Sequence, residues 1–72
     1  MGKTVDARGF SCPQPVMMTL DEISAMGRGE IVVLVDADAA RENVVRAAAS
    51  QGWQMTDIQS ENDEYRITIS KT

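Results

Sequence analysis

The feature that most constrains the fold of this chain is a run of five consecutive aliphatic residues, Ile-Val-Val-Leu-Val, at positions 31–35. Aliphatic and β-branched residues in an unbroken row are typical of a strand that is covered on at least one face. We therefore expect a strand over residues 30–36.

A first helix is expected before this strand, because apolar residues recur there with helical spacing. It should begin near residues 12–15 and end at Gly27 and Gly29, since glycine commonly terminates helices. Its apolar stripe consists of Val16, Leu20, Ile23 and Gly27, flanked by Met17 and Met26.

A second helix is expected after the strand, over residues 39–51. Asp36 and Asp38 are candidate N-caps for it, because aspartate is favoured at that position, and Gly52 ends it. Its stripe consists of Ala40, Val44, Ala47 and Ala48. These small side chains would let the helix lie close to a sheet.

Three further segments favour strands. Residues 4–7 are β-prone, and residues 53–59 give a weaker strand pattern. In the last segment, hydrophobic and polar residues alternate in the manner of a half-buried strand. That segment consists of Tyr65, Ile67 and Ile69 alternating with Arg66, Thr68 and Ser70. The polar residues 60–63 supply a turn between the last two strands.

The order of elements is therefore β-α-β-α-β-β, which predicts an α/β chain of the α+β two-layer sandwich type. We expect one four-stranded mixed sheet with both helices on one face, because right-handed crossovers place them on the same side. Seventy-two residues correspond to one small domain, so residues 1–72 are expected to form a single unit.

Charge and composition exclude several classes of protein. Seven basic and eleven acidic residues give a net charge of −4, and the basic residues are scattered. Direct nucleic-acid binding needs clustered cations, so we expect none. No apolar run approaches the ~18 residues of a membrane-spanning helix, and no secretory signal is visible. We expect a cytoplasmic protein that functions as a monomer and does not associate with membranes.

Cys12 is the only cysteine, and the chain contains no histidine. An internal disulfide framework is therefore excluded, and a zinc site built by the protein alone is not expected. Without a second thiol, Cys12 cannot complete a dithiol–disulfide cycle within the chain. It can instead accept one atom from one protein and release it to another.

The segment Cys12-Pro13-Gln14-Pro15 predicts an exposed thiol at a helix start. Cys12 is expected at the N-cap and Pro13 at the first helical position. The positive end of the helix dipole, the amides of Gln14 and Val16, and the nearby Arg8 would each favour a thiolate. A buried structural cysteine is the alternative, since free cysteine is among the most buried residue types.

The pattern Asp-x-x-Gly-x-x-Cys-Pro-x-Pro, formed by Asp6, Gly9, Cys12, Pro13 and Pro15, resembles the TusA-like (SirA-like) sulfurtransferase family. The resemblance covers essentially the whole chain. It continues through Val16-Met17-Met18, Gly29-Glu30, Asp36-Ala37-Asp38 and the final strand from Tyr65 to Ile69. The segment from Val35 to Gly52 looks similar to the N-terminal domain of YedF-type proteins, which are linked to selenium metabolism.

The resemblance implies that Cys12 accepts persulfide sulfur from a cysteine desulfurase-like donor and relays it to an acceptor protein. Such a chain is a sulfur carrier, or a sulfurtransferase if it counts as an enzyme. No metal or organic cofactor is expected beyond the transient persulfide. The final product is left open: tRNA thiolation, molybdenum cofactor, sulfur oxidation or selenium handling. A regulatory or protein-binding module that does not need the thiol is the alternative, and selenium delivery is another.

Other residues of the motif are expected to support Cys12. Asp6 would orient the Arg8 loop or accept backbone amides, and a turn former at the end of the strand is the alternative. Gln14 stands where some family members carry an acid. Candidate partner contacts are Phe10 and Met17, as an apolar rim beside the thiol, and Asp38, which would face a basic donor. For Met17 a place in the core, and for Asp36 and Asp38 a capping role, are the alternatives.

Overall fold

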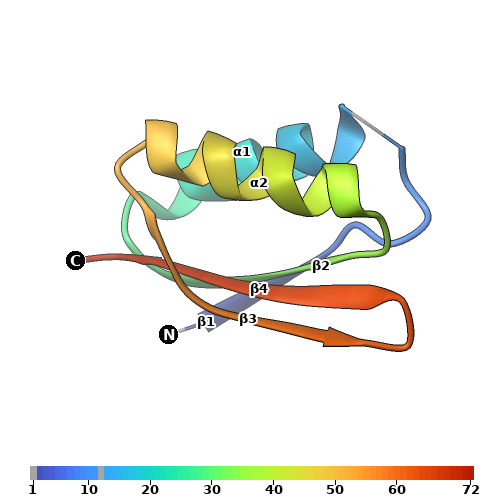
Figure 1. Ribbon diagram of the computed structural model, residues 1–72. Coiled ribbons are helices and arrows are strands. Elements are labelled where there is room, and N and C mark those ends of the chain that lie inside the picture. Colours follow the sequence, from blue (N-terminus) through green and yellow to red (C-terminus); the bar gives the residue numbers. More distant parts are fainter. Residues whose placement is uncertain (1, 12) are drawn as a thin grey trace.

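The computed structural model describes residues 2–11 and 13–72, and its elements follow the predicted order β-α-β-α-β-β (Figure 1). They are β1 (Gly2–Asp6), α1 (Gln14–Met26), β2 (Gly29–Val35), α2 (Asp38–Ser50), β3 (Gln54–Glu61) and β4 (Glu64–Lys71). Cys12 lies outside the described residues.

The four strands form one mixed sheet in the order β1-β2-β4-β3. β2 pairs in parallel with β1 and antiparallel with β4, and β4 pairs antiparallel with β3. Both helices lie on one face of the sheet, and none of the described residues forms a helix on its other face (Figure 1). The predicted α+β two-layer arrangement is confirmed.

The aliphatic run of β2 is covered on one face. Ile31, Val33 and Val35 are completely buried, whereas Val32 and Leu34 are half-buried on the opposite face. This alternation follows from the period of two along a strand. Across the sheet, Val33 lies between Val5 of β1 and Ile67 of β4, so the buried row continues through three strands.

The second helix packs as its sequence predicts. Ala40, Val44 and Ala48 are buried, and Ala47 is half-buried. Trp53 follows the helix and is only 2% exposed. Its backbone N–H donates to the carbonyl of Ala48, which ties the start of the third strand to the end of α2.

The buried face of α1 agrees with the prediction at Ile23 and is shifted by one position before it. Pro15 and Thr19 are buried there, while Val16 and Leu20 are half-buried and pack against the core. A threonine hydroxyl inside a core needs a partner. The Thr19 hydroxyl donates to the carbonyl oxygen of Pro15 at 2.9 Å, so its burial leaves no unpaired group. The sequence pattern missed this face because it counted threonine as polar.

The helix starts also differ from the prediction. The N-cap of α1 is Pro13, one residue after the expected Cys12. The N-cap of α2 is Ala37, without a side-chain hydrogen bond, so neither Asp36 nor Asp38 caps that helix. Both aspartates instead bond to other parts of the molecule. At the end of α1, Gly27 is the C-cap with a φ of +75°, as expected of a terminating glycine.

The β3–β4 hairpin turns through two residues, Asn62 and Asp63, with φ angles of +52° and +63°. Positive φ at both central residues is the signature of a type I′ turn, in which glycine is preferred at the second position. Asp63 adopts this conformation at a steric cost that glycine does not have.

No helix among the described residues is long and apolar enough to cross a membrane.

We predict that Asp63→Gly stabilises the protein by about 0.5 kcal/mol, because the relief of left-handed strain exceeds the added entropy of the unfolded chain. Urea unfolding measures the change. Gln59→Gly, within β3, is the matched control and should destabilise the protein by about 0.5–1 kcal/mol. Equal losses of stability in both variants would contradict the assignment of strain to Asp63.

Candidate functional site

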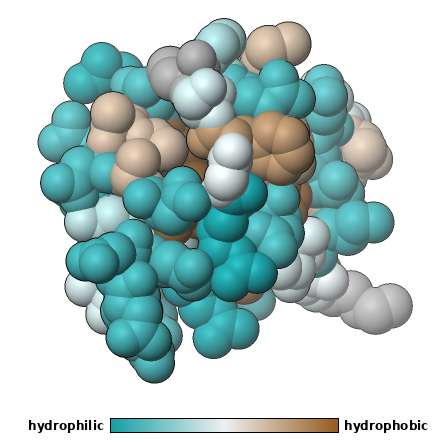
Figure 2. Space-filling model, turned by 90° about the vertical axis from the view of Figure 1, so that its right-hand side faces the viewer, coloured by the Kyte–Doolittle hydropathy of each residue, from teal (hydrophilic) through white to brown (hydrophobic). Residues whose placement is uncertain are grey.

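The candidate site is the β1–α1 loop, which lies at one end of the molecule together with the β2–α2 turn and the β3–β4 hairpin (Figure 1). Figure 2 views this end and shows hydrophobic surface surrounded by hydrophilic residues. Phe10 in the loop is 48% exposed and Met17 in the first turn of α1 is 53% exposed. Met17 is therefore not a core residue, and both side chains are available to a partner.

Each backbone amide from residue 7 to residue 10 donates a hydrogen bond. The amide of Ala7 extends the β1–β2 ladder by bonding to the carbonyl of Leu34 at 2.8 Å. The amides of Arg8 and Gly9 bond to side-chain carboxylates, and that of Phe10 bonds within the loop to the carbonyl of Ala7 at 3.4 Å. Paired amides restrict a backbone to few conformations. The backbone of residues 7–10, which leads toward Cys12, is therefore held by a hydrogen bond at each residue.

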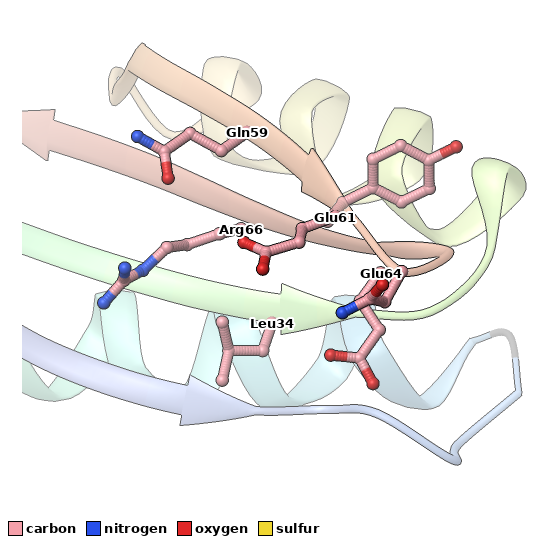
Figure 3. A pocket seen from close by; sticks show the side chains of 7 residues that line it. Leu34, Gln59, Glu61, Glu64 and Arg66 are labelled. Carbon is pink, nitrogen blue, oxygen red and sulfur yellow. The ribbon is translucent and has the colours of Figure 1, made fainter.

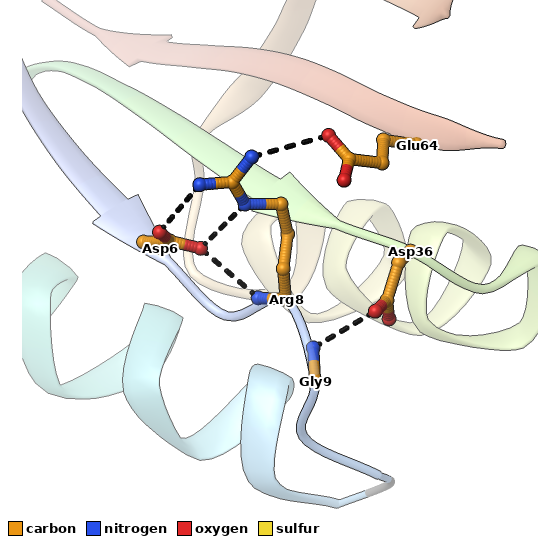
Figure 4. Close-up of polar contacts among 5 residues, drawn as sticks. All are labelled: Asp6, Arg8, Gly9, Asp36 and Glu64. Carbon is orange, nitrogen blue, oxygen red and sulfur yellow. Dashed lines mark hydrogen bonds and ion pairs between the residues drawn. The ribbon is translucent and has the colours of Figure 1, made fainter. Parts of the chain in front are cut away.

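The side chain of Arg8 lies between two carboxylates, an arrangement that we call the Arg8 cluster (Asp6, Arg8 and Glu64; Figure 4). Its Nε and Nη2 donate to the two oxygens of Asp6 at 2.9 and 2.8 Å, which is the bidentate geometry. Its Nη1 donates to Oε1 of Glu64 at 3.1 Å. Asp6 also accepts the Arg8 amide at 3.2 Å, a contact that fits both an acceptor of backbone amides and a turn former at the end of the strand.

The Arg8 cluster changes the charge that the loop presents. The Arg8 side chain and then its backbone N–H lower the pKa of Asp6 from the ordinary 3.8 to about 2. Asp6 and then Glu64 raise the pKa of Arg8 above its ordinary value. One guanidinium shared by two carboxylates leaves the cluster with a net charge of −1. The positive charge that the sequence places near Cys12 is thus largely compensated by Asp6 and Glu64.

At the start of α1 the positive end of the helix dipole has no acidic side chain of the first turn beside it. The amide of Gln14 is not free for the sulfur as expected, since it donates to the carbonyl of Ser11 at 2.9 Å. The helix dipole is therefore the main feature of the described residues that would favour a thiolate at Cys12.

The β2–α2 turn connects the site to the hairpin. The hydroxyl of Tyr65 donates to Oδ1 of Asp38 in a short hydrogen bond, which raises the pKa of Tyr65. The guanidinium of Arg41 lies over the Tyr65 ring, 5.2 Å from its centroid. Asp38, expected to face a basic partner, thus already has a partner within the chain. Its pairing with Tyr65 joins residues 27 positions apart, which no local pattern could predict.

A hollow of about 320 Å³ lies at the hairpin end of the sheet (Figure 3). Leu34, Gln59 and Arg66 point into it from β2, β3 and β4 on the face away from the helices. Its remaining lining residues are Glu61, Asn62, Glu64 and Tyr65.

Within residues 2–11 and 13–72, no group of three or more carboxylate or thiol side chains is arranged to hold a metal ion.

Together these features define a small α+β protein whose lone cysteine precedes a proline-rich helix start and follows a loop with hydrogen-bonded amides at residues 7–10. The family model described as "Sulfurtransferase TusA" matches residues 3–71. The chain therefore belongs to the TusA sulfurtransferase family.

Named relatives and one solved structure agree with this assignment. A putative sulfur carrier protein of Archaeoglobus fulgidus is 28% identical over 68 residues, which cover 93% of each chain. The putative sulfur carrier protein YedF of Escherichia coli K12 is 31% identical over 68 residues, covering 93% of this chain and 88% of YedF. The crystal structure of a SirA-like protein from Desulfitobacterium hafniense superposes with a TM-score of 0.86 at 32% identity. That match covers 94% of this chain and 95% of the other.

We predict that Asp6→Asn removes part of the acid sensitivity of folding. Because the folded state lowers the pKa of Asp6 from 3.8 to about 2, its ionised form stabilises the protein above about pH 4. That contribution disappears as the pH falls toward 2. The urea midpoints of wild type and variant should therefore differ at pH 5 and converge near pH 2.

The matched control is Asp21→Asn, which removes an exposed carboxylate of α1 that forms no ion pair among the described residues. Its midpoint should follow that of the wild type across the range. A gap between wild type and Asp6→Asn that stays constant from pH 5 to pH 2 would count against the Arg8 cluster.

Proposed function

We propose that this chain carries sulfur as a persulfide on Cys12, receiving it from a cysteine desulfurase-like donor and passing it to an acceptor protein in a reducing compartment. Membership of the TusA family and the relatives named as putative sulfur carriers support this proposal. The observation that carries it is the position of the only cysteine. Cys12 stands directly before the Pro13 cap of α1 and after a loop in which each backbone amide of residues 7–10 donates a hydrogen bond.

The proposed transfer is a thiol–persulfide exchange that balances without an external oxidant or reductant. The Cys12 thiolate attacks the terminal sulfur of the donor persulfide. The S–S bond of the donor breaks, the donor leaves as a thiolate, and a new S–S bond forms on Cys12. The proton of the persulfide remains on the transferred sulfur. In the second step an acceptor thiolate attacks that sulfur, and Cys12 leaves as a thiolate.

The exposed side chains of Phe10 and Met17 support a protein partner at this step. Phe10 precedes Cys12 by two residues, and Met17 lies in the first turn of α1. Large apolar side chains that are about half exposed gain free energy when a partner covers them. We propose that they form the apolar part of the surface on which donor and acceptor dock.

The proposal predicts a gain in mass of one sulfur atom when the protein is incubated with a cysteine desulfurase and L-cysteine. Intact mass spectrometry without reductant measures this gain, which dithiothreitol should reverse. Cys12→Ser should remain unmodified, because it lacks the nucleophile.

Two outcomes would contradict the carrier role. One is a wild-type protein that gains no sulfur under these conditions while the desulfurase is active. The other is a Cys12→Ala variant that restores full growth or activity to a strain lacking the gene, since a protein-binding module does not need the thiol.

We further predict that the double variant Phe10→Ser, Met17→Ser is loaded about tenfold more slowly by a subsaturating desulfurase, because weaker docking lowers the fraction bound. Loading by inorganic polysulfide should stay within about twofold of wild type, since this small donor needs no docking surface. Rapid-quench mass spectrometry measures both rates.

Met55→Ser is the matched control, because Met55 is also large, apolar and 42% exposed, but lies on β3. It should be loaded as fast as wild type by both donors. If the double variant were slowed equally with polysulfide and with desulfurase, Phe10 and Met17 would affect the thiol and not docking.

A further inference from the structure

The side chain of Asp36 is used in a way that neither its position nor the motif predicts. It follows the last residue of β2 and precedes α2, where an aspartate is expected to cap the helix. The cap is Ala37 instead, and it has no side-chain hydrogen bond. Oδ2 of Asp36 accepts the backbone N–H of Gly9 at 2.9 Å, across 27 positions of sequence (Figure 4).

The conformation of Gly9 fits this contact. Its φ is +84°, in the left-handed region that favours glycine, and a Cβ built on it would meet no atom within 4 Å. Backbone conformation, and not lack of space, therefore accounts for glycine at this position. The chain takes this turn three residues before Cys12, where the direction of the backbone changes between the sheet and α1.

Two hydrogen bonds to carboxylates of other elements hold consecutive residues of the loop from different directions. Arg8 bonds to Glu64 of the hairpin, and Gly9 bonds to Asp36 at the end of β2. The next amide, that of Phe10, bonds only within the loop. Among the loop amides for which a hydrogen bond is observed, that of Gly9 is thus the last before Cys12 to bond outside the loop, and Asp36 accepts it.

We infer that Asp36 is a positioning residue for Cys12, which acts by accepting the Gly9 amide and not through its charge toward a partner. The inference rests on the proposed function and adds to it the group that orients the approach to the thiol. Asp36 does not touch the transferred sulfur. Its effect is to keep the loop in one conformation, so that a docked persulfide meets Cys12 in line for attack.

Substitution of Asp36 by asparagine and by alanine distinguishes a hydrogen-bond acceptor from a charged contact with the donor protein. Asp36→Asn keeps an oxygen acceptor of the same length and removes the charge, whereas Asp36→Ala removes both. We expect loading by the desulfurase to fall about tenfold in Asp36→Ala and to stay within about twofold of wild type in Asp36→Asn. Asp63→Asn is the matched control, because it removes an exposed carboxylate that lines the same surface hollow as Asp36. It should load as wild type does.

Amide hydrogen exchange of Gly9, followed by NMR, gives a second readout that does not depend on sulfur chemistry. Exchange should be about tenfold faster in Asp36→Ala and close to wild type in Asp36→Asn. Thermal unfolding of every variant, with loading measured well below all midpoints, separates local loosening of the loop from loss of the fold.

Each other outcome has a definite meaning. If Asp36→Asn and Asp63→Asn load as slowly as Asp36→Ala, negative charge toward the donor is what matters, and the inference is overturned. Unchanged loading in Asp36→Ala overturns it as well. If wild type gains no sulfur at all, the proposed function fails. The Gly9 exchange rates then still decide whether Asp36 orders the loop.

Discussion

The pairing of β2 on both of its edges is the interaction on which the rest of this structure depends. β1 pairs with it in parallel and β4 antiparallel, while the side chains of Ile31, Val33 and Val35 are buried against the helices. A strand fixed on two edges and one face cannot shift register without exposing its apolar row. The residue that follows it, Asp36, is thereby placed at the same end of the sheet as the end of β1. The pairing of β2 therefore determines where Asp36 and the β1–α1 loop lie relative to each other.

The order of elements could be predicted from the sequence because it depends on hydrophobic periodicity, which is a local property. The run at residues 31–35 and the alternation at the end of the chain each indicated a strand that the structure contains. The face of α1 was predicted one position away, because Thr19 is buried through a hydrogen bond to its own helix. A pattern that counts hydroxyl groups as polar cannot detect such burial.

The contacts around the loop could be predicted only in part. The side-chain bond between Asp6 and Arg8 joins residues two apart, whereas the sequence suggested only that Asp6 orients the Arg8 loop or accepts backbone amides. The roles of Asp36, Glu64 and Tyr65 depend on residues 27 to 56 positions away, so they follow from the sheet topology and not from local spacing. The sequence placed a cation beside Cys12 without the two carboxylates that share it, of which Glu64 lies 56 positions away and Asp6 was not expected to pair with the Arg8 side chain. The site is consequently less positive than its motif implies, and the N-terminal end of α1 gains importance for the thiolate.

The contact between Arg8 and Glu64 also has a consequence for the order of events during folding. It joins residues separated by 56 positions. Closing so long a loop has an entropic cost that is offset only when β4 pairs with β2. The approach to the cysteine is therefore completed by β4, which is synthesised after the other three strands of this sheet. A chain still emerging from the ribosome has its cysteine early but lacks the ordered loop, so full competence for exchange with a partner should arise only as the sheet closes.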